Sequence, residues 1–538
     1  MTRKPTRSVK PRPRKRAATT TSRVSPVQNK AVSVVSIDWA VVLGLIAAVL
    51  FVFVQLRGAG FLSLDDDFNI LNNPHVNTGL TLENFKWAFG IQQHFWMPLV
   101  WLSWMANVSF YGMSAGDLHM ANVVVHAASS IILYGLLVRT TGLRGRSAFV
   151  AGLFAVHPLR VESVAWITEQ KDTLSTLFWW LSLWAYITWV ENRRWTAYAA
   201  SLVLFGLGMM AKPMLVTVPV TLLLLDIWPL GRVDWSRNTS ATLWRLTLEK
   251  WPFLVLAAAD SFIAIAAQGT VLVTTTAVPM ALRIENGFVS CGLYLSMFVW
   301  PSKLVIFYPY RFDLDPWLIG TCVVGVIGMS AVAWRLRRRV PYVAAGWFWY
   351  LATLLPVIGL FQIGNHARAD RYTYVPLVGI FVIIAWGAAD LWKRWRLNSL
   401  ALAVVASAAF VGYAVTARVQ TSYWQDSATL WRHVLDVMPD NYLALNSLGA
   451  ILISEGHQEE GLSLLRRAVA SNPDFTPSHY NLGLALMNAG QLREAEAELV
   501  TASKQQPNNA DVRYNLALLL SVTGRTDDAV SEFRAAAY

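Results

Sequence analysis

Apolar blocks of about 20 residues recur along this chain, and this pattern constrains its fold more than any other feature. A helix of about 20 apolar residues crosses a hydrocarbon core of about 30 Å. Such blocks occur near 37–57, 118–138, 147–165, 173–190, 195–211, 213–230, 252–272, 316–334, 342–362, 373–392 and 398–418. Charged residues make up only 14% of the chain. The pattern predicts an all-α polytopic membrane protein with about eleven transmembrane helices in a domain spanning 37–420.

Basic residues set the expected orientation of these helices. Of the net charge of +12, ten Lys and Arg residues fall in the first 30 positions, before the first acid, Asp38. We interpret residues 1–36 as a disordered cytoplasmic tail that obeys the positive-inside rule, although binding of nucleic acid or anionic lipid would use the same charges. Short loops such as "RLRRR" at 335–339 continue the bias. The N-terminus is therefore expected in the cytoplasm and the C-terminus outside it.

One further apolar block, 286–304, does not fit this orientation. If it crossed the membrane as a twelfth span, the basic segment 335–339 would lie outside, against the charge rule. We therefore interpret it as a re-entrant or interface-lying helix within an outer loop that covers 270–315. Another outer loop, the first along the chain, is expected at 58–117, so the loop at 270–315 is the second.

After the last span the chain repeats. Residues 421–538 carry glycine and proline at a spacing of 34, with helix-forming segments between them: Gly449 and Gly483; Gly456, Gly490 and Gly524; Pro439, Pro473 and Pro507. This period is typical of the tetratricopeptide repeat, which pairs two antiparallel helices in each unit. A half unit, "YWQDSATLWRHVLDVMPDN" at 423–441, precedes two full units and a third that begins at 510. Such arrays present a concave surface that binds extended peptides.

Three adjacent carboxylates follow the first span. Asp65 and Asp66, with Asp67 beside them, lie where a lipid headgroup would meet the protein surface. They are candidates for a general base, with Asp65 and Asp66 also candidate ligands of a divalent cation such as Mg²⁺ or Mn²⁺. A solvated acidic turn remains an equal alternative at this stage.

The junction "HPLRVESVAWITEQKD" at 157–172 mixes charges of both signs among apolar residues. Its carboxylates are Glu162, Glu169 and Asp172, and its cations are Arg160 and Lys171. Ionisable groups near membrane depth are costly, so they indicate a functional site. A site for a lipid-linked phosphate needs acids for proton transfer or metal binding and cations that offset the phosphate charge.

A third polar segment, "GNHARADRYTYVP" at 364–376, lies at the outer end of a span. Arg368, Arg371 and Tyr372 form a candidate phosphate clamp, and the alternative is snorkelling beside an aromatic belt. His157, and the His119, Asn122 and His126 face of "HMANVVVHA", fit structural hydrogen bonding better than metal binding. The chain has no phosphate-binding glycine loop and no G-x-S-x-G motif, which argues against soluble nucleotide or hydrolase chemistry.

Taken in order, these segments resemble the transmembrane and tetratricopeptide-repeat (TMTC) O-mannosyltransferase family and its bacterial relatives. The matching residues are Asp65 and Asp66 with Ile70, Asn73 and Pro74, then "HMANVVVHA", "HPLRVESVAWITEQKD", "AKPMLVTVPVTLLLLDIWPL", "WPSKLVIFYPY" and "ADRYTYVP". They run from about 60 to 390, and the repeats follow in the expected place. Each motif is short, and the ordered set carries the resemblance.

The resemblance implies a C-type glycosyltransferase fold that takes a sugar from a polyprenyl-phosphate carrier and passes it to an acceptor outside the cytoplasm. It assigns the acids of the first outer loop to Asp65 and Asp66, and the acid after the third span to Glu162 and Asp172. It also implies a bacterial inner-membrane location, a donor lipid, a protein acceptor on the repeats, and no nucleic-acid partner. Because Lys171 departs from the animal sequences, mannose is not implied.

Two other functions fit the same sequence. One is a membrane-anchored tetratricopeptide scaffold whose transferase domain is inactive, and the other is a ligase that transfers a whole lipid-linked glycan. The intact set of acids and cations favours a glycosyltransferase over the scaffold.

Overall fold

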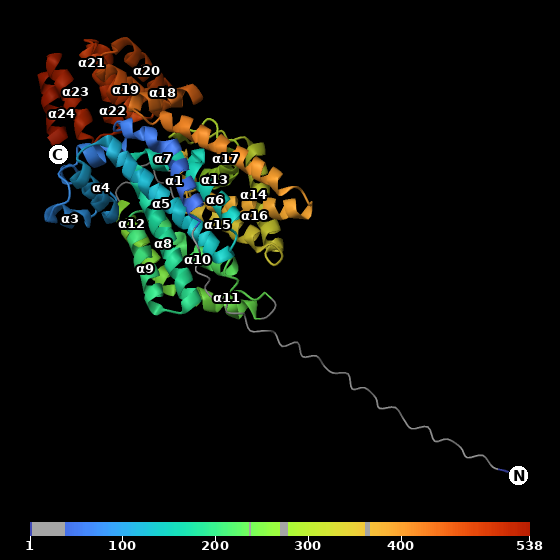
Figure 1. Cartoon of the computed structure of the whole chain (residues 1–538). Coiled ribbons are helices and arrows are strands. Elements are labelled where there is room, and N and C mark those ends of the chain that lie inside the picture. The colour runs from blue at the N-terminus through green and yellow to red at the C-terminus, as the bar shows by residue number, and fades with distance from the viewer. Residues whose placement is uncertain (3–37, 236–237, 269–277, 361–365, 538) are drawn as a thin grey trace. The chain divides into compact units, whose positions relative to one another are not determined.

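The structure is a computed structural model that describes residues 1–2, 38–235, 238–268, 278–360 and 366–537. Within these residues the chain is almost entirely helical, and the strands β1 (Tyr308–Pro309) and β2 (His366–Arg368) pair in an antiparallel ribbon. Figure 1 shows the order of the elements. The predicted all-α membrane fold with C-terminal repeats is confirmed. The tail at 1–36 lies outside the described residues except for its first two.

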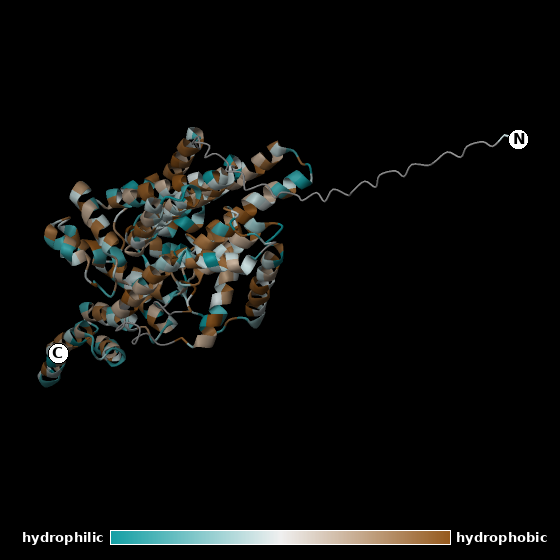
Figure 2. Cartoon of the chain, turned by 90° about the horizontal axis from the view of Figure 1, so that it is seen from below, coloured by the Kyte–Doolittle hydropathy of each residue, from teal (hydrophilic) through white to brown (hydrophobic). Residues whose placement is uncertain are grey.

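Within the described residues, four helices are long and apolar enough to cross a membrane. They are α1 (Trp39–Phe53) with the turn η1 that extends it to Gly58, α5 (Ala115–Thr141), α14 (Pro316–Leu336) and α17 (Ser399–Ser422). Two bent helix pairs, Arg144–Val156 with Pro158–Ala165 and Thr239–Leu248 with Trp251–Ala267, raise the number to six if each is one span. Figure 2 shows hydrophobic residues, in brown, on many of the helices. The number of eleven spans stays a prediction.

The sequence places clear start and stop signals at these helices. The side chains of Asp38, Ser114, Asp315 and Asn398 accept hydrogen bonds from the first free backbone N–H groups of α1, α5, α14 and α17. Such N-caps satisfy donors that have no partner inside the helix. At its other end α5 stops at Gly142, whose φ of 72° is the left-handed conformation that favours glycine.

A broken stretch between two long helices forms the polar junction 157–172. Helix α6 (Arg144–Val156) ends before the His157–Pro158 pair, because proline disfavours the helical conformation of the residue before it. The turn η3 (Pro158–Arg160), the helix α7 (Val161–Ala165) and the turn η4 (Ile167–Glu169) follow before α8 (Gln170–Asn192) begins. The helices on either side of His157 are bent by 59°. These breaks turn several charged side chains towards one another.

The helices α15 (Pro341–Leu354) and α16 (Leu377–Arg394) approach closely at two glycines. A Cβ atom on Gly379 would lie 2.2 Å from the carbonyl oxygen of Gly346, and one on Gly346 would lie 2.4 Å from the carbonyl oxygen of Gly379. Only glycine allows this backbone contact. It fixes the helix that follows the turn η6 (Asp370–Thr373), which carries Arg371.

The apolar block 286–304 is mostly contained in helix α13 (Met280–Val299), which buries one side, including Asn286, Ser290 and Tyr294. With 20 residues, helix α13 is long enough to cross a membrane, but it is not apolar enough to be one of the candidate spans. Its interpretation as a re-entrant or interface helix stays a prediction.

The C-terminal repeats form helix pairs, as the 34-residue period predicts. Close packing inside each pair depends on small residues, since a Cβ atom on Gly483 would lie 2.7 Å from Leu499 and one on Gly449 would lie 2.9 Å from Leu465. The pairs are α19 (Tyr442–Ser454) with α20 (Gln458–Ser471), α21 (Thr476–Asn488) with α22 (Leu492–Gln505), and α23 (Ala510–Val522) with α24 (Thr526–Ala537). Helix α18 (Ser427–Val437) forms the half unit before them.

The remaining elements complete the path of the chain through the membrane part. They are η2 (Asp67–Leu71), α2 (Pro74–Asn77), α3 (Leu82–Ala88), α4 (Pro98–Tyr111), α9 (Trp195–Met209), η5 (Pro213–Thr217), α10 (Val218–Ile227), α11 (Thr239–Leu248) and α12 (Trp251–Gln268).

Candidate functional site

A buried cluster of six charged side chains forms around the broken junction. The carboxylates are Glu162 from α7, Glu169 from η4 and Asp172 from α8, and the cations are Lys171 from α8, Lys212 before η5 and Arg371 from η6. Segments that are about 200 residues apart in sequence therefore meet here.

Arg371 joins two of these carboxylates. Its Nη1 pairs with Glu162 Oε1, its backbone N–H donates to Glu162 Oε2 at 2.9 Å, and its Nε lies 3.3 Å from Glu169 Oε1. The guanidinium also lies 5.5 Å from the ring centre of Trp166. A forked cation held by two carboxylates and an aromatic ring has a fixed orientation.

Two lysines complete the cluster. Lys171 Nζ lies 3.1 Å from Glu169 Oε1, the oxygen that also faces Arg371. Lys212 Nζ pairs with Asp172 Oδ1 and lies 3.7 Å from Glu169 Oε2. The other oxygen of Asp172 accepts a hydrogen bond from Ser163 Oγ at 3.0 Å.

The cations lie nearer to solvent than the acids do. The side chains of Lys171, Lys212 and Arg371 are 23%, 14% and 14% exposed, whereas those of the three carboxylates are 1–3% exposed. Burial alone would raise the pKa of Glu169, but Lys171, Lys212 and Arg371 outweigh burial and lower it, so Glu169 stays ionised. An anion that approaches the cluster meets positive charge first.

Asp66 is linked to this cluster by hydrogen bonds to Thr168, the residue before Glu169. Its Oδ1 accepts hydrogen bonds from Thr168 N at 3.1 Å and Thr168 Oγ1 at 2.5 Å, and its Oδ2 accepts from Leu62 N at 3.2 Å. The side chain is fully buried. Burial raises the pKa of Asp66 to about 6, although the three hydrogen bonds act against this shift.

Asp65 differs from its neighbour because it is exposed. The two carboxylates therefore do not form a joint pair, and both oxygens of Asp66 already have donors. In the part of the chain that the structure describes, no group of three or more His, Cys, Asp or Glu side chains could hold a metal ion. The arrangement of Asp65 and Asp66 does not fit a metal site, and we derive no step through a metal.

Arg160 lies apart from the exposed cations. Its guanidinium is fully buried between the rings of Phe154, Tyr374 and Phe381, at 5.4–5.5 Å from their centres. Its Nη1 donates to Thr373 O at 2.9 Å, and its Nε and Nη2 have no hydrogen-bond partner among the residues that the structure describes. This packing holds η6 against α6 and keeps Arg160 from solvent.

The remaining predicted residues lie on β2 and η6, around Arg371. The guanidinium of Arg368 lies 4.3 Å from the ring centre of Tyr308, and Tyr372 pairs its hydroxyl with His366 Nε2 at 2.6 Å. The Arg371 guanidinium lies 5.3 Å from the Tyr372 ring centre. The segment 366–372 is thus a small aromatic and cationic wall beside the cluster.

The histidines of the two short motifs have structural partners. His157 Nδ1 accepts from Leu159 N at 3.3 Å and so caps η3, and His126 bonds to Tyr374 Oη at 2.6 Å and Ala155 O at 3.1 Å. Asn122 donates to Trp166 O at 3.0 Å. These contacts agree with the structural role that the sequence indicates for them.

The sequence alone indicates no separate role for two members of the cluster. It identifies Glu169 as one carboxylate among several in the junction 157–172, and Lys212 as part of the motif "AKPMLVTVPVTLLLLDIWPL". A signal for Lys212 exists, because "MMAKPM" places a lysine between two apolar segments, where an ionisable side chain is costly.

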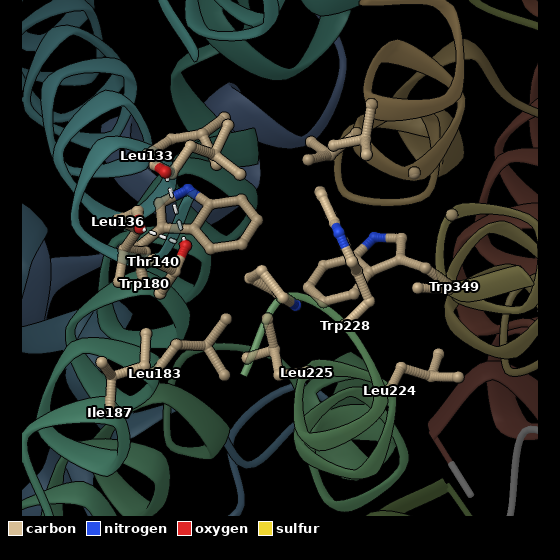
Figure 3. Close-up of a pocket in the computed structure, with 17 residues that line it drawn as sticks. Leu133, Leu136, Thr140, Trp180, Leu183, Ile187, Leu224, Leu225, Trp228 and Trp349 are labelled. Atoms are coloured by element: carbon tan, nitrogen blue, oxygen red, sulfur yellow. Dashed lines mark hydrogen bonds between the residues drawn. The ribbon is translucent and has the colours of Figure 1, made fainter. Parts of the chain in front are cut away.

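An apolar cavity of about 60 Å³ lies along α8 from the cluster. Figure 3 shows Trp180 of α8 and Trp349 of α15 beside it, whose rings stack at 6.0 Å. The hydroxyl of Thr140, a polar group in the lining, donates to Leu136 O at 2.8 Å, so its hydrogen-bonding need is met within the protein. A pocket of this composition accommodates apolar groups.

These features define a class: a multi-helix membrane protein with a buried, charge-balanced site and C-terminal tetratricopeptide repeats. Residues 99–277 match the family described as Dolichyl-phosphate-mannose-protein mannosyltransferase, and residues 480–538 match the tetratricopeptide repeat. The similarity to Protein O-mannosyl-transferase Tmtc1 of Drosophila melanogaster is 23% identity over 80% of this chain and 61% of that protein. The resemblance inferred from the sequence is confirmed.

Two further relatives carry the same type of name. Protein O-mannosyl-transferase TMTC4 of Homo sapiens is 24% identical over 67% of this chain and 56% of its own length, and TMTC1 of Mus musculus is 33% identical over 23% and 14%. This chain therefore spans about three fifths or less of the length of these relatives. The crystal structure of APC/C hetero-tetramer Cut9-Hcn1 covers 82% of this chain and 86% of that chain at 12% identity, but its TM-score of 0.22 carries no argument.

Proposed function

We propose that this chain is a membrane glycosyltransferase that moves a sugar from a polyprenyl-phosphate-linked donor to a Ser or Thr hydroxyl of an extracytoplasmic protein. The names of the relatives support glycosyl transfer. The polyprenyl-phosphate donor, the protein acceptor, an inverting mechanism and the bacterial inner membrane are our inference. In the proposed orientation the tail at 1–36 is cytoplasmic, and the cluster and repeats face the other side.

The observation that carries the proposal is the layered charge of the cluster, with Lys171, Lys212 and Arg371 towards solvent and their carboxylates behind them. The donor phosphate gains negative charge as its bond to the sugar breaks. Fixed cations at that point stabilise the transition state more than the ground state. Glu162, Glu169 and Asp172 hold these cations in place, so their proposed catalytic role is to orient them.

The acceptor hydroxyl must lose a proton as its oxygen bonds to the sugar carbon. In an inverting transfer that oxygen attacks from the face opposite the phosphate, the carbon–oxygen bond to the phosphate breaks, and its electron pair stays on the phosphate. We assign the proton to Asp66, whose pKa of about 6 suits a base near neutral pH. Since Asp66 is buried, Leu62 or Thr168 must release one of its oxygens first. We place Asp65, which is exposed, where the acceptor would enter the site.

The outer wall around Arg371 completes the donor site in this proposal. Arg368 and Tyr372 lie on the same segment as Arg371, and we assign them to contact with the sugar or the phosphate. Arg160, by contrast, is assigned to donor binding only through its support of η6, because its guanidinium is buried.

The repeats are proposed to bind the acceptor. Asn481 donates to Asn446 Oδ1 at 3.0 Å, and Asn515 donates to Tyr480 Oη at 3.0 Å. Asn446 and Tyr480 are 34 residues apart, as are Asn481 and Asn515, so polar side chains recur on α19, α21 and α23 from one repeat to the next. Amide and hydroxyl groups of this kind suit the backbone of an extended peptide.

The test is a comparison of glycosylated proteins by mass spectrometry in cells that carry the gene, lack it, or carry Asp66→Asn. We expect specific Ser or Thr glycopeptides to be lost without the gene and with Asp66→Asn, and kept with the matched variant Asp67→Asn. Unchanged glycopeptides without the gene would favour the inactive scaffold. Loss of a whole glycan from an acceptor would favour the ligase.

A further inference from the structure

The half unit at 423–441 contacts the first outer loop, which carries Asp66. Gly60 N donates to Gln425 O at 2.9 Å, and Ser63 N donates to Ser427 Oγ at 2.6 Å. Both contacts lie within a few residues of Leu62, whose N–H donates to Asp66. Asp66 in turn holds Thr168, the residue before Glu169. Hydrogen bonds and short stretches of backbone therefore join the half unit to the cluster.

The half unit also contacts the second outer loop, at a segment that we name the connecting segment (residues 304–309). The carbonyl of Leu304 accepts from His433 Nε2 at 2.9 Å, and that of Phe307 accepts from Asn441 Nδ2 at 3.1 Å. The Phe307 ring meets the Tyr442 ring edge to face, with centres 5.7 Å apart. The start of the repeats is thus fixed to this segment by polar and aromatic contacts.

The connecting segment continues into the wall of the site. Its Tyr308 pairs with Arg368 across the β1–β2 ribbon, and its hydroxyl donates to Asp370 Oδ1 at 3.0 Å. Asp370 precedes Arg371, whose backbone N–H donates to Glu162. The second series of contacts therefore ends at the same cluster as the first, at Glu162 and Arg371 rather than at Glu169.

We propose that the half unit is a positioning element that sets the geometry of the charged cluster according to the state of the repeats. Asn441 and Tyr308 are its positioning residues, since neither touches the six charged side chains directly. The inference rests on the proposed function, because it makes engagement of a protein acceptor by the repeats a regulator of the donor site. The half unit contacts both the first outer loop near Asp66 and the connecting segment. A shift of the half unit therefore moves Thr168, next to Glu169, and Asp370, next to Arg371, together.

The test is hydrogen exchange on the purified full chain, which needs no sugar transfer. Asn441→Asp keeps a side-chain oxygen that can accept from Ala444 N and cap α19, but it removes the N–H that donates to Phe307 O. Loss of this hydrogen bond should speed exchange at 366–373 by roughly threefold to tenfold. The matched control is Asn509→Asp, which makes the same change at the equivalent cap of α23. It should leave exchange at 366–373 unchanged.

Tyr308→Phe provides the reciprocal measurement. It removes the hydroxyl that donates to Asp370 and accepts from Val305 N at 3.1 Å, but it keeps the ring under Arg368. Coupling must act equally in both directions. Exchange in the half unit at 433–441 should rise, whereas Tyr342→Phe, which removes a hydroxyl bond of 3.0 Å to Asp390, should not affect it. If both Asn441→Asp and Tyr308→Phe leave the distant segment within twofold of the unaltered chain, the proposal is wrong.

The outcomes separate this inference from the proposed function. Coupled exchange in a chain that transfers no sugar would reject only the glycosyltransferase assignment. Sugar transfer by a chain without coupled exchange would reject only the positioning role. In an active chain, Asn441→Asp should lower kcat for a repeat-bound protein acceptor more than for a short Ser/Thr peptide.

Discussion

Replacing Arg371 with alanine tests whether the cluster is a charge-balanced site. The change leaves Glu162 and Glu169 buried at 3% and 1% exposure without the cation that joins them. Removing one partner of a buried ion pair typically costs about 3–5 kcal/mol. We expect the free energy of unfolding to fall by about that amount. Arg371→Lys should restore only part of the lost free energy of unfolding, because one ammonium group cannot reach both carboxylates as Nη1 and Nε of the guanidinium do.

The assay is denaturant unfolding of the purified chain in detergent, followed by tryptophan fluorescence. Arg371→Ala combined with Glu162→Gln should lose less stability than Arg371→Ala alone, since the second change removes one unpaired buried charge. The matched control is Arg466→Ala, which breaks an Arg–Glu pair whose side chains are 50% and 62% exposed. That pair should contribute no more than about 1 kcal/mol.

A loss below about 1 kcal/mol for Arg371→Ala, equal to that of the surface control, would refute the reasoning. It would mean that Arg371 points to water or lipid headgroups rather than to Glu162. In a transfer assay the same variant should reduce the rate by about 10²–10³-fold, the usual effect of removing one group that stabilises developing negative charge.

Three further predictions concern other parts of the account. Asp66→Asn should lower the transfer rate by about 10²–10⁴-fold in a folded chain, and near-normal turnover of the variant would reject Asp66 as the base. The unaltered chain should lose activity as the pH falls through about 6, because Asp66 is then protonated. Lys212→Met should destabilise the chain and weaken donor binding, since Asp172 and Glu169 lose a cation, and a donor KM that does not change would exclude Lys212 from the donor site. A reporter that is active only in the cytoplasm, fused after Asp440, should stay inactive, and activity there would overturn the topology.

The pH dependence of stability follows from the same carboxyl group. Because burial raises the pKa of Asp66 above its ordinary value, the folded chain binds this proton more tightly than the unfolded chain does. The contribution of Asp66 to stability is therefore fully present below the ordinary pKa and declines as the pH rises towards about 6. Asp66→Asn removes this part of the pH dependence, which makes it a readout of burial that is independent of activity.

The local elements of this chain could be predicted from its sequence because their signals are local. The apolar blocks at 37–57, 118–138, 316–334 and 398–418 coincide with the four long apolar helices, and the 34-residue period coincides with the helix pairs. Hydrophobic length and small-residue spacing act within one element, so no tertiary information is needed.

The membership of the site was only partly predictable, since it depends on which elements pack together. The junction 157–172 is recognisable in the sequence from its charged residues. The ion pair of Lys212 with Asp172, by contrast, joins residues 40 positions apart and depends on how η5 packs near α8. The difference between Asp65, which is exposed, and Asp66, which is buried, arises from Thr168 and Leu62. The burial of Arg160 depends on three aromatic rings from separate segments. None of these is visible in a single stretch of sequence.

The central claim is tested most directly by reconstituting the purified full chain in lipid vesicles with radiolabelled polyprenyl-phosphate-linked sugars and a Ser/Thr-containing acceptor protein. The account predicts transfer of label to the acceptor from at least one of these donors, with inverted configuration at the sugar carbon and with loss of transfer in Arg371→Ala. The account would be contradicted if the folded chain transferred label from none of the polyprenyl-phosphate donors. It would also be contradicted if the Arg371→Ala variant transferred label as well as the unaltered chain.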